Sequence, residues 1–458
     1  MRRAIPIVLA LAALVALGGA AGDRRRAAED AKLVIPFERF ELGNGLEVLL
    51  HVDHGAPLVA VNVWYHVGAF HERPGRTGFA HLFEHMMFQG SAHVRDDGHF
   101  QTLEAIGASE INGTTDYDRT NYFETVPANH LETALWMESD RMGFLLNDLG
   151  PGKLANQIGV VQNERRQGYE SAPYGLAEEE LWQALFPAPH PYHGMVIGSM
   201  ADIGAASLDD VRDFFRTWYA PNNATLVIAG DFDPAAARRL VERYFGSLPR
   251  GPEPARPQVA EVRVAGEKRL ARAEKVGRLP RVMIGWLTPA FFAEGDAAAD
   301  LLAMILGSGE ASLLNRRLVR ELEIAQGVEA YQESLGAQSV FHLNVTGRPG
   351  VDPERLLAEI DGVLARARAG EITEAQLVRA RNRYETRFMR RLQKLGGFGG
   401  RADLLQSYNH FLGDPGYLAR DVGRYRAVTR DQLTAFATDA LATERRVVMF
   451  AVPAEVQP

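Results

Sequence analysis

The residues best suited to chemistry lie in a run of five, His81-Leu82-Phe83-Glu84-His85. In a helix, residues three and four apart share one face, so the two imidazoles and the carboxylate would project together. Two neutral imidazoles can bind one zinc ion, and a neighbouring glutamate can take a proton from water that zinc activates. This spacing is the H-x-x-E-H arrangement, the inverse of the commoner H-E-x-x-H.

A five-residue match also arises by chance, so the surroundings of the motif matter. Five large apolar side chains surround the trio, and burying two histidines and a glutamate among them without partners would be costly. This setting favours a metal site over an accidental match. The apolar neighbours are Phe79, Leu82, Phe83, Met86 and Met87.

A catalytic zinc site needs a third protein ligand and an open fourth position. Glu164 is a candidate, because Leu154, Ile158 and Val161 predict an apolar helical stripe and Glu164 falls at its edge. The alternative is a surface glutamate that pairs with one of the two following arginines. Spacing alone leaves both interpretations open.

The elements that must position these side chains can be read from the patterning. Residues 77–88 predict the helix that carries the motif, capped by Thr77 and closed by Gly90. Residues 37–52 predict a hairpin that turns at residues 43–45, and residues 224–229 predict a buried strand. Because hairpins and helices are mixed along the chain, the expected fold class is α+β.

The 458 residues exceed the size of a single hydrophobic core, so more than one domain is expected. Proline and glycine are concentrated in residues 250–258, which predicts a linker. We therefore expect a catalytic zinc-binding domain at residues 32–249 and a second domain without a metal site at residues 259–458. The second half follows a similar order of strands and helices.

The N-terminus has the three parts of a secretory signal peptide. Arg2 and Arg3 precede an apolar run, and small residues lead to the charged stretch that begins at Asp23. We predict a cleaved signal over residues 1–21, export to the periplasm or beyond, and no stable membrane span after cleavage. The alternative is a retained membrane anchor, since the apolar run approaches the minimum spanning length.

Composition excludes several classes of function. The chain has no cysteine, which rules out disulfides and thiolate metal ligands and leaves His, Asp and Glu to bind any metal. Removing residues 1–21 takes away Arg2 and Arg3, so the formal charge falls from −8 to −10. An acidic chain without a long basic block argues against a nucleic-acid partner.

The motif and its context resemble the pitrilysin/insulinase family of zinc metallopeptidases, the inverzincins, and within it the two-domain bacterial branch similar to processing peptidases. The resemblance covers nearly the whole first half, and a weaker likeness around residues 306–309 extends it into the second. The matching segments are residues 76–88 (RTGFAHLFEHMMF), 160–166 (VVQNERR), 190–192 (HPY), 219–224 (YAPNNA) and 230–232 (GDF).

The resemblance implies that Glu164 completes the site with His81 and His85 around one Zn²⁺ per chain, with Glu84 as the catalytic base. It also implies two similar α+β halves, each a mostly antiparallel sheet covered by helices. Residues Asn112, Gly113 and Thr114 resemble the family's edge strand, which pairs with the backbone of a peptide substrate. The alternative for this segment is an ordinary turn, because Asn-Gly favours one.

The chain departs from the family pattern at two places. Gln157 stands where many members carry a second glutamate, and it cannot ionise. Val319 and Gln326 replace an Arg and a Tyr that hold substrate in four-domain members, while Arg401 and Tyr408 have the same spacing but lie too late in the chain. With one zinc motif and two domains, the chain resembles half of a four-domain chamber, so a second related subunit is expected.

These observations leave two alternative functions to be tested. The first is a zinc endopeptidase that hydrolyses peptides or small unfolded proteins. The second is a non-catalytic structural or assembly subunit that keeps the peptidase fold. The complete set of His81, Glu84, His85 and Glu164 argues against the second, because a purely structural subunit has no physical need for it.

Overall fold

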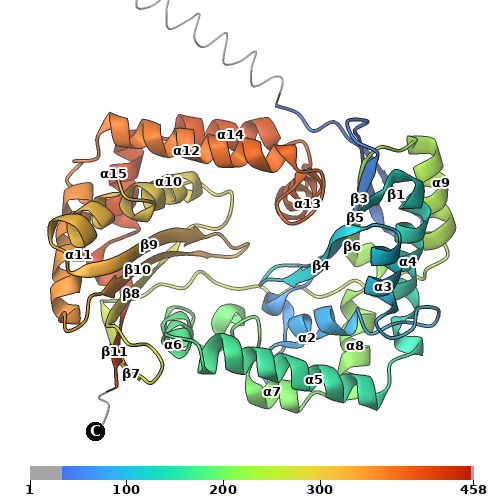
Figure 1. Ribbon diagram of the computed structural model, residues 1–458, viewed down its shortest axis with the longest axis horizontal. Helices are drawn as coiled ribbons and strands as arrows, with labels where there is room; N and C mark the ends of the chain where they lie inside the picture. Colours follow the sequence, from blue (N-terminus) through green and yellow to red (C-terminus); the bar gives the residue numbers. More distant parts are fainter. Residues whose placement is uncertain (1–32, 455–458) are drawn as a thin grey trace, which may run out of the picture.

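The structure is a computed structural model that describes residues 33–454, so the predicted signal peptide at residues 1–21 lies outside the described residues. It contains two sheets, each covered by helices, which confirms the predicted α+β class with two similar halves (Figure 1). Within residues 33–454, no helix is both long enough and apolar enough to cross a membrane.

The first sheet has six strands in the order β1-β2-β6-β3-β5-β4. All neighbours are antiparallel except β2 and β6, and the predicted hairpin is the β1–β2 pair. β4 lies at one edge and pairs only with β5. The strands are β1 (Glu38–Glu41), β2 (Glu47–Val52), β3 (Leu58–Tyr65), β4 (Ser109–Thr115), β5 (Thr120–Pro127) and β6 (Ala224–Gly230).

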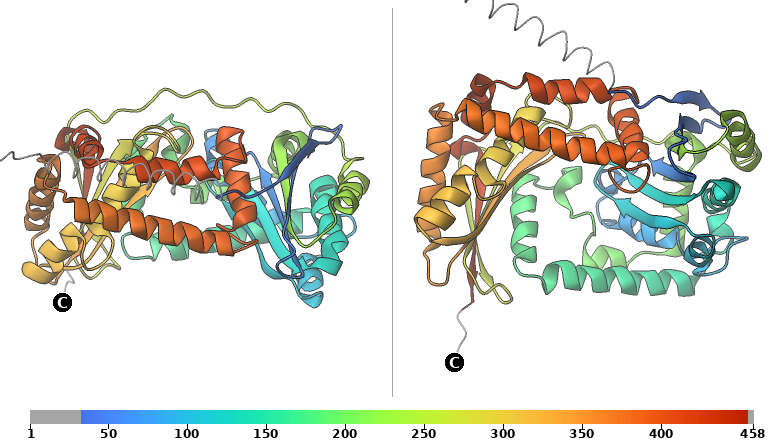
Figure 2. Two further views of the ribbon diagram at one scale, coloured as in Figure 1. Left: turned by 90° about the horizontal axis from the view of Figure 1, so that it is seen from above. Right: turned by 45° about the horizontal axis from the view of Figure 1, so that its top comes forward.

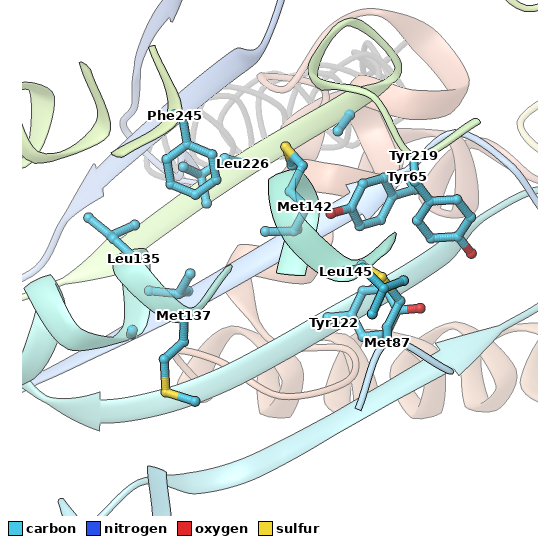
Figure 3. Packing of buried hydrophobic residues seen from close by; sticks show 14 of the residues in the cluster. Tyr65, Met87, Tyr122, Leu135, Met137, Met142, Leu145, Tyr219, Leu226 and Phe245 are labelled. Atoms are coloured by element: carbon cyan, nitrogen blue, oxygen red, sulfur yellow. The ribbon is translucent and has the colours of Figure 1, made fainter. Parts of the chain in front are cut away.

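One face of this sheet supports the helices that carry the predicted site. Alternate strand residues such as Val61, Tyr122 and Leu226 pack against α2, α4, α8 and α9, and Figure 3 shows part of this core around Met137 and Met142 of α4. The helices of the first half are α2 (Phe79–Met86), α3 (Gly98–Ala105), α4 (Leu131–Phe144), α5 (Pro151–Arg165), α6 (Gly175–Leu185), α7 (Met200–Gly204), α8 (Leu208–Trp218) and α9 (Pro234–Phe245).

The second sheet has five strands in the order β7-β11-β8-β10-β9, antiparallel except for the β7–β11 pair. Its strands are β7 (Lys268–Glu274), β8 (Arg281–Thr288), β9 (Ala325–Glu333), β10 (Ser339–Gly347) and β11 (Arg446–Pro453). Its helices are α10 (Asp296–Gly307), α11 (Pro353–Arg368), α12 (Glu374–Gln393), α13 (Arg401–Leu412), α14 (Leu418–Ala427) and α15 (Arg430–Asp439).

The two halves exchange one helix each, which the sequence did not predict. α6 leaves the first half and packs on the second sheet, where Leu181 and Trp182 contact Met283 and Met449. α13 belongs to the second half but covers the other face of the first sheet, where Leu405 packs with Leu49 and Val227 (Figure 1). Each sheet therefore buries one of its faces only with help from the other half.

The predicted linker lies in an extended segment without regular secondary structure, which runs between the two halves (Figure 2). Hydrogen bonds attach this segment to both halves. Arg256 donates to the side-chain oxygen of Asn223 at 3.0 Å, and Val262 N donates to Gln338 at 2.9 Å. The proposed domain bounds stay a prediction, and the exchanged helices make the halves interdependent in packing.

Candidate metal centre

The helix that carries the motif, α2, is capped from a distance rather than by Thr77. The Glu72 carboxylate accepts hydrogen bonds from Gly78 N at 2.9 Å and from Ala80 N at 2.7 Å. The Thr77 hydroxyl instead donates to Asp202 at 2.6 Å, so the predicted Thr77 cap is wrong. Burial raises the pKa of Glu72 to about 8. The two N–H groups it satisfies would otherwise lack partners at the start of the helix.

Gly78 begins α2 in a conformation that only glycine adopts readily. Its φ is +86°, and an added Cβ would lie 2.6 Å from the carbonyl oxygen of Ile197. This close approach fixes the start of α2 against the segment before α7. The register of the helix, and so the direction of the motif side chains, depends on that contact.

α2 and α5 bring three predicted ligands together. Glu164 Oε2 lies 3.7 Å from His81 Nε2 and 3.4 Å from His85 Nε2, and one ligand atom from each residue falls within 4.8 Å of the others. Two imidazole nitrogens and a carboxylate oxygen facing one point form a donor set that zinc accepts. The set fits a metal ion, and the role of each residue as a ligand stays a prediction.

The charges on His81 and Glu164 favour binding a cation. Burial lowers the pKa of His81 to about 4, so its imidazole is neutral near pH 7. A hydrogen bond from His85 holds the pKa of Glu164 below its ordinary value. Burial opposes a charge on His85, but its hydrogen bond to Glu164 raises the pKa overall. A neutral imidazole and an ionised carboxylate are the forms that bind metals.

Glu84 stands beside the three predicted ligands and is itself mostly buried. Burial raises its pKa, and the Thr115 hydroxyl counteracts this by donating to Glu84 Oε2 at 2.6 Å. A glutamate with an elevated pKa and a hydrogen bond to its charged form can take and return a proton near neutral pH. Thr115 was not singled out from the sequence, because it is 31 positions away from Glu84.

The segment Asn112, Gly113 and Thr114 forms part of β4, so the alternative of a turn is wrong. These residues pair with Phe123, Tyr122 and Asn121 of β5 and lie on the edge of the sheet. A Cβ on Gly113 would lie 3.1 Å from Glu84 Cγ, which places this edge directly against the motif helix. Their predicted contact with a peptide stays a prediction.

Arg119 holds the end of β4 in place. Its guanidinium donates to the Thr114 carbonyl at 2.8 Å and lies 5.1 Å from the centre of the Trp64 ring. The positive charge of Arg119 also lowers the pKa of Glu84, after larger effects from burial, Thr115 and His85. This role could not be predicted from the sequence, because Arg119 follows a loop and has no periodic pattern around it.

Gln157, Arg401 and Tyr408, which were weighed against the family pattern, each have a clear place in the structure. Gln157 is buried on α5, and its side chain helps to raise the pKa of His85. Arg401 forms an ion pair with Asp53, and Tyr408 donates to Asp421 at 2.7 Å. Both side chains are engaged by packing of α13, in agreement with their spacing being a coincidence.

A second group of metal-binding residue types was missed from the sequence. His99, Glu124 and Glu138 lie together beneath α4, and all three are buried. One feature of the sequence pointed to this group. Glu138 lies on the same helical face as Leu131 and Leu135, at a position where an apolar residue would be expected.

Comparison with known proteins agrees with this architecture. Residues 47–189 match the family described as Insulinase (Peptidase family M16), and residues 205–384 match the Peptidase M16 inactive domain. The zinc protease PqqE of Helicobacter pylori (strain ATCC 700392 / 26695) is 30% identical over 367 residues, which cover 79% of this chain and 82% of that protein.

Solved structures show the same fold. A protease from Helicobacter pylori superposes with a TM-score of 0.85 at 27% identity and covers 91% of this chain and 100% of its own. The periplasmic protease PqqL from Escherichia coli gives a TM-score of 0.74 at 18% identity over 92% of this chain and 48% of its own. The chain thus folds as a two-domain α+β protein with a candidate His/Glu metal group. The chain belongs to the M16 peptidase (insulinase) family.

Proposed function

We propose that this protein is a zinc-dependent endopeptidase that hydrolyses peptides or small unfolded proteins. One observation carries the proposal. Three candidate ligands, His81, His85 and Glu164, converge beside Glu84, whose carboxylate accepts a hydrogen bond. Sequence similarity to a protein named a zinc protease also supports the proposal. A non-catalytic structural subunit, the alternative, would have no use for these four side chains in this arrangement.

The mechanism assigns a separate task to each group. His81, His85 and Glu164 would hold one Zn²⁺, which acts as a Lewis acid toward water and the peptide carbonyl. Glu84 takes a proton from the attacking water and delivers it to the nitrogen of the leaving amine. The Thr115 hydroxyl keeps the Glu84 carboxylate oriented and limits the rise of its pKa.

The substrate class follows from the edge of the first sheet. In the part of the chain that the structure describes, β4 has a neighbouring strand on one side only and lies against α2, so an extended peptide can add to it beside Glu84. Main-chain pairing recognises extended shape more than sequence. This favours unfolded substrates, with Asn112, Gly113 and Thr114 as backbone contacts.

Two further proposals concern partners and location. The chain carries one H-x-x-E-H motif in two domains, so we propose that a second related subunit, a copy or a different chain, completes the chamber. We also propose export to the periplasm or beyond, based on residues 1–21. No nucleic acid is expected as a partner of this acidic chain.

The test is cleavage of fluorogenic peptides by the purified chain, alone and mixed with related proteins. We expect a chelator to abolish cleavage and zinc to restore it, and Glu84→Gln to lose about 10²- to 10⁴-fold in kcat while retaining zinc. Equal cleavage by Glu84→Gln and the parent would refute the proposal. Activity that appears only in a mixture would establish the divided chamber.

A further inference from the structure

A buried polar cluster lies apart from the candidate metal centre. It consists of His99 on α3, Glu124 on β5, and Glu138 and Arg141 on α4. His99, Glu124 and Glu138 are 3%, 1% and 0% exposed. No residue of this cluster takes part in the proposed peptidase mechanism, so its chemistry needs a separate explanation.

The hydrogen bonding of the cluster is incomplete within residues 33–454. Arg141 binds Glu138 through Nε at 2.9 Å and through a second nitrogen, which compensates that carboxylate. Both oxygens of Glu124, the Nε2 atom of His99 and the Nη1 atom of Arg141 have no hydrogen-bond partner. A carboxylate and an imidazole nitrogen buried without partners are costly, so a further positive group is expected between them.

The geometry suits a metal ion. One ligand atom from each of His99, Glu124 and Glu138 lies within 4.8 Å of the others, so all three fit within about 2.8 Å of a common centre. Small side-chain rotations would bring them to the bonding distances of zinc, about 2.0 to 2.2 Å. We propose that His99, Glu124 and Glu138 bind a structural Zn²⁺, a second metal site in this chain.

Arg141 is the residue that positions this site. It holds the Glu138 carboxylate from behind, as hydrogen-bonding partners of metal ligands do, and stacks at 4.3 Å over the Tyr122 ring. With both carboxylates ionised, the cluster carries a net charge of −1 when empty and +1 when a divalent ion is bound. Binding the ion therefore changes the sign of the cluster's net charge but not its magnitude.

A proton on Glu124 is the competing explanation. Burial raises the pKa of Glu124, and a proton would make the cluster neutral. A protonated Glu124 would donate to Glu138 and accept from the ring N–H of His99, whereas a metal ion would bind His99 Nε2 and Glu124 together. The two explanations differ in metal content and in the effect of Glu124→Gln.

The site would join three elements next to the substrate edge. α3, α4 and β5 would each supply a ligand, and within residues 33–454 β5 is the only strand paired with β4. The Phe88 ring lies 5.5 Å from the His99 ring and also borders Gly113. A bound ion would thus stabilise the region that supports β4 without contacting substrate.

The decisive experiment measures metals by mass spectrometry in the full-length protein and in His81→Ala/His85→Ala, purified with zinc present. We expect about two zinc ions per chain in the parent and about one in the double variant. A folded double variant that contains no zinc would overturn the second site. If instead both proteins hold about one zinc ion, the second site stands and the proposed catalytic zinc fails.

Glu124→Gln separates a metal from a proton. The metal site predicts the loss of about one zinc ion per chain and a melting temperature lower by several degrees, and added zinc should no longer raise that temperature. Unchanged zinc content with an equal or higher melting temperature would assign the cluster to a shared proton and overturn the proposal. Glu104→Gln, on the exposed face of α3, is the matched control and should change neither quantity.

Discussion

Thr115→Val tests how the structure sets the strength of Glu84 as a base. The substitution keeps the shape of the side chain and removes the hydroxyl that donates to Glu84 at 2.6 Å. A hydrogen bond to a charged group is worth about 1.5 to 3 kcal/mol. Its loss makes Glu84 about 10- to 100-fold harder to ionise, because 1.36 kcal/mol corresponds to a factor of ten.

The assay is the pH dependence of kcat/KM for a fluorogenic peptide. The acid side of the profile should move to higher pH in Thr115→Val, with a loss of about 10- to 100-fold at a pH on that side and a smaller loss at alkaline pH. Thr115→Ser keeps the hydroxyl and should follow the parent. An acid side that does not move in Thr115→Val, with zinc content intact, would refute the role assigned to Thr115 and to Glu84 ionisation.

Three further predictions concern stability. Glu72→Ala removes the cap of α2 and should cost about 1 to 2 kcal/mol of unfolding free energy, measured by urea denaturation; no change would contradict the capping role. The half-buried rings of His66 and His410 contact each other between the two halves, and loss of hydration lowers the pKa of His66 to about 3 and that of His410 well below 6.5. The two histidines therefore stabilise the fold fully above pH 6.5. Below pH 6.5 the free energy of unfolding falls by about 1.4 kcal/mol per pH unit for each histidine. His410→Gln should make this dependence of the unfolding free energy on pH less steep. Separate expression of residues 33–254 and 255–454 should give insoluble halves that become soluble together, because α6 and α13 are exchanged; a monomeric half with cooperative unfolding would contradict this.

Much of the local structure was predictable because its causes are local. The strands at residues 224–230 and 339–347 are continuous apolar or alternating runs. The motif helix can be predicted from the helical periodicity of its apolar residues. His81, Glu84 and His85 share one face for the same reason. Glu164 needed the family resemblance, since its meeting with the histidines depends on how α5 packs against α2.

Other features depend on tertiary packing and left little trace in the sequence. Glu72 caps α2 although it lies six residues before Gly78, because a short turn folds it back onto the N–H groups. The exchange of α6 and α13 could not be read from their amphipathic patterns, because such a pattern shows that a face is buried but does not identify the sheet that buries it.

The most direct measurement is a zinc anomalous difference map from crystals of the full-length protein, collected on both sides of the zinc absorption edge. The account predicts a peak at bonding distance, about 2.0 to 2.2 Å, from His81 Nε2, His85 Nε2 and a carboxylate oxygen of Glu164, with Glu84 beside it but not bonded. With zinc in excess, the absence of a peak between these three side chains, or a peak whose ligands exclude Glu164, would contradict it.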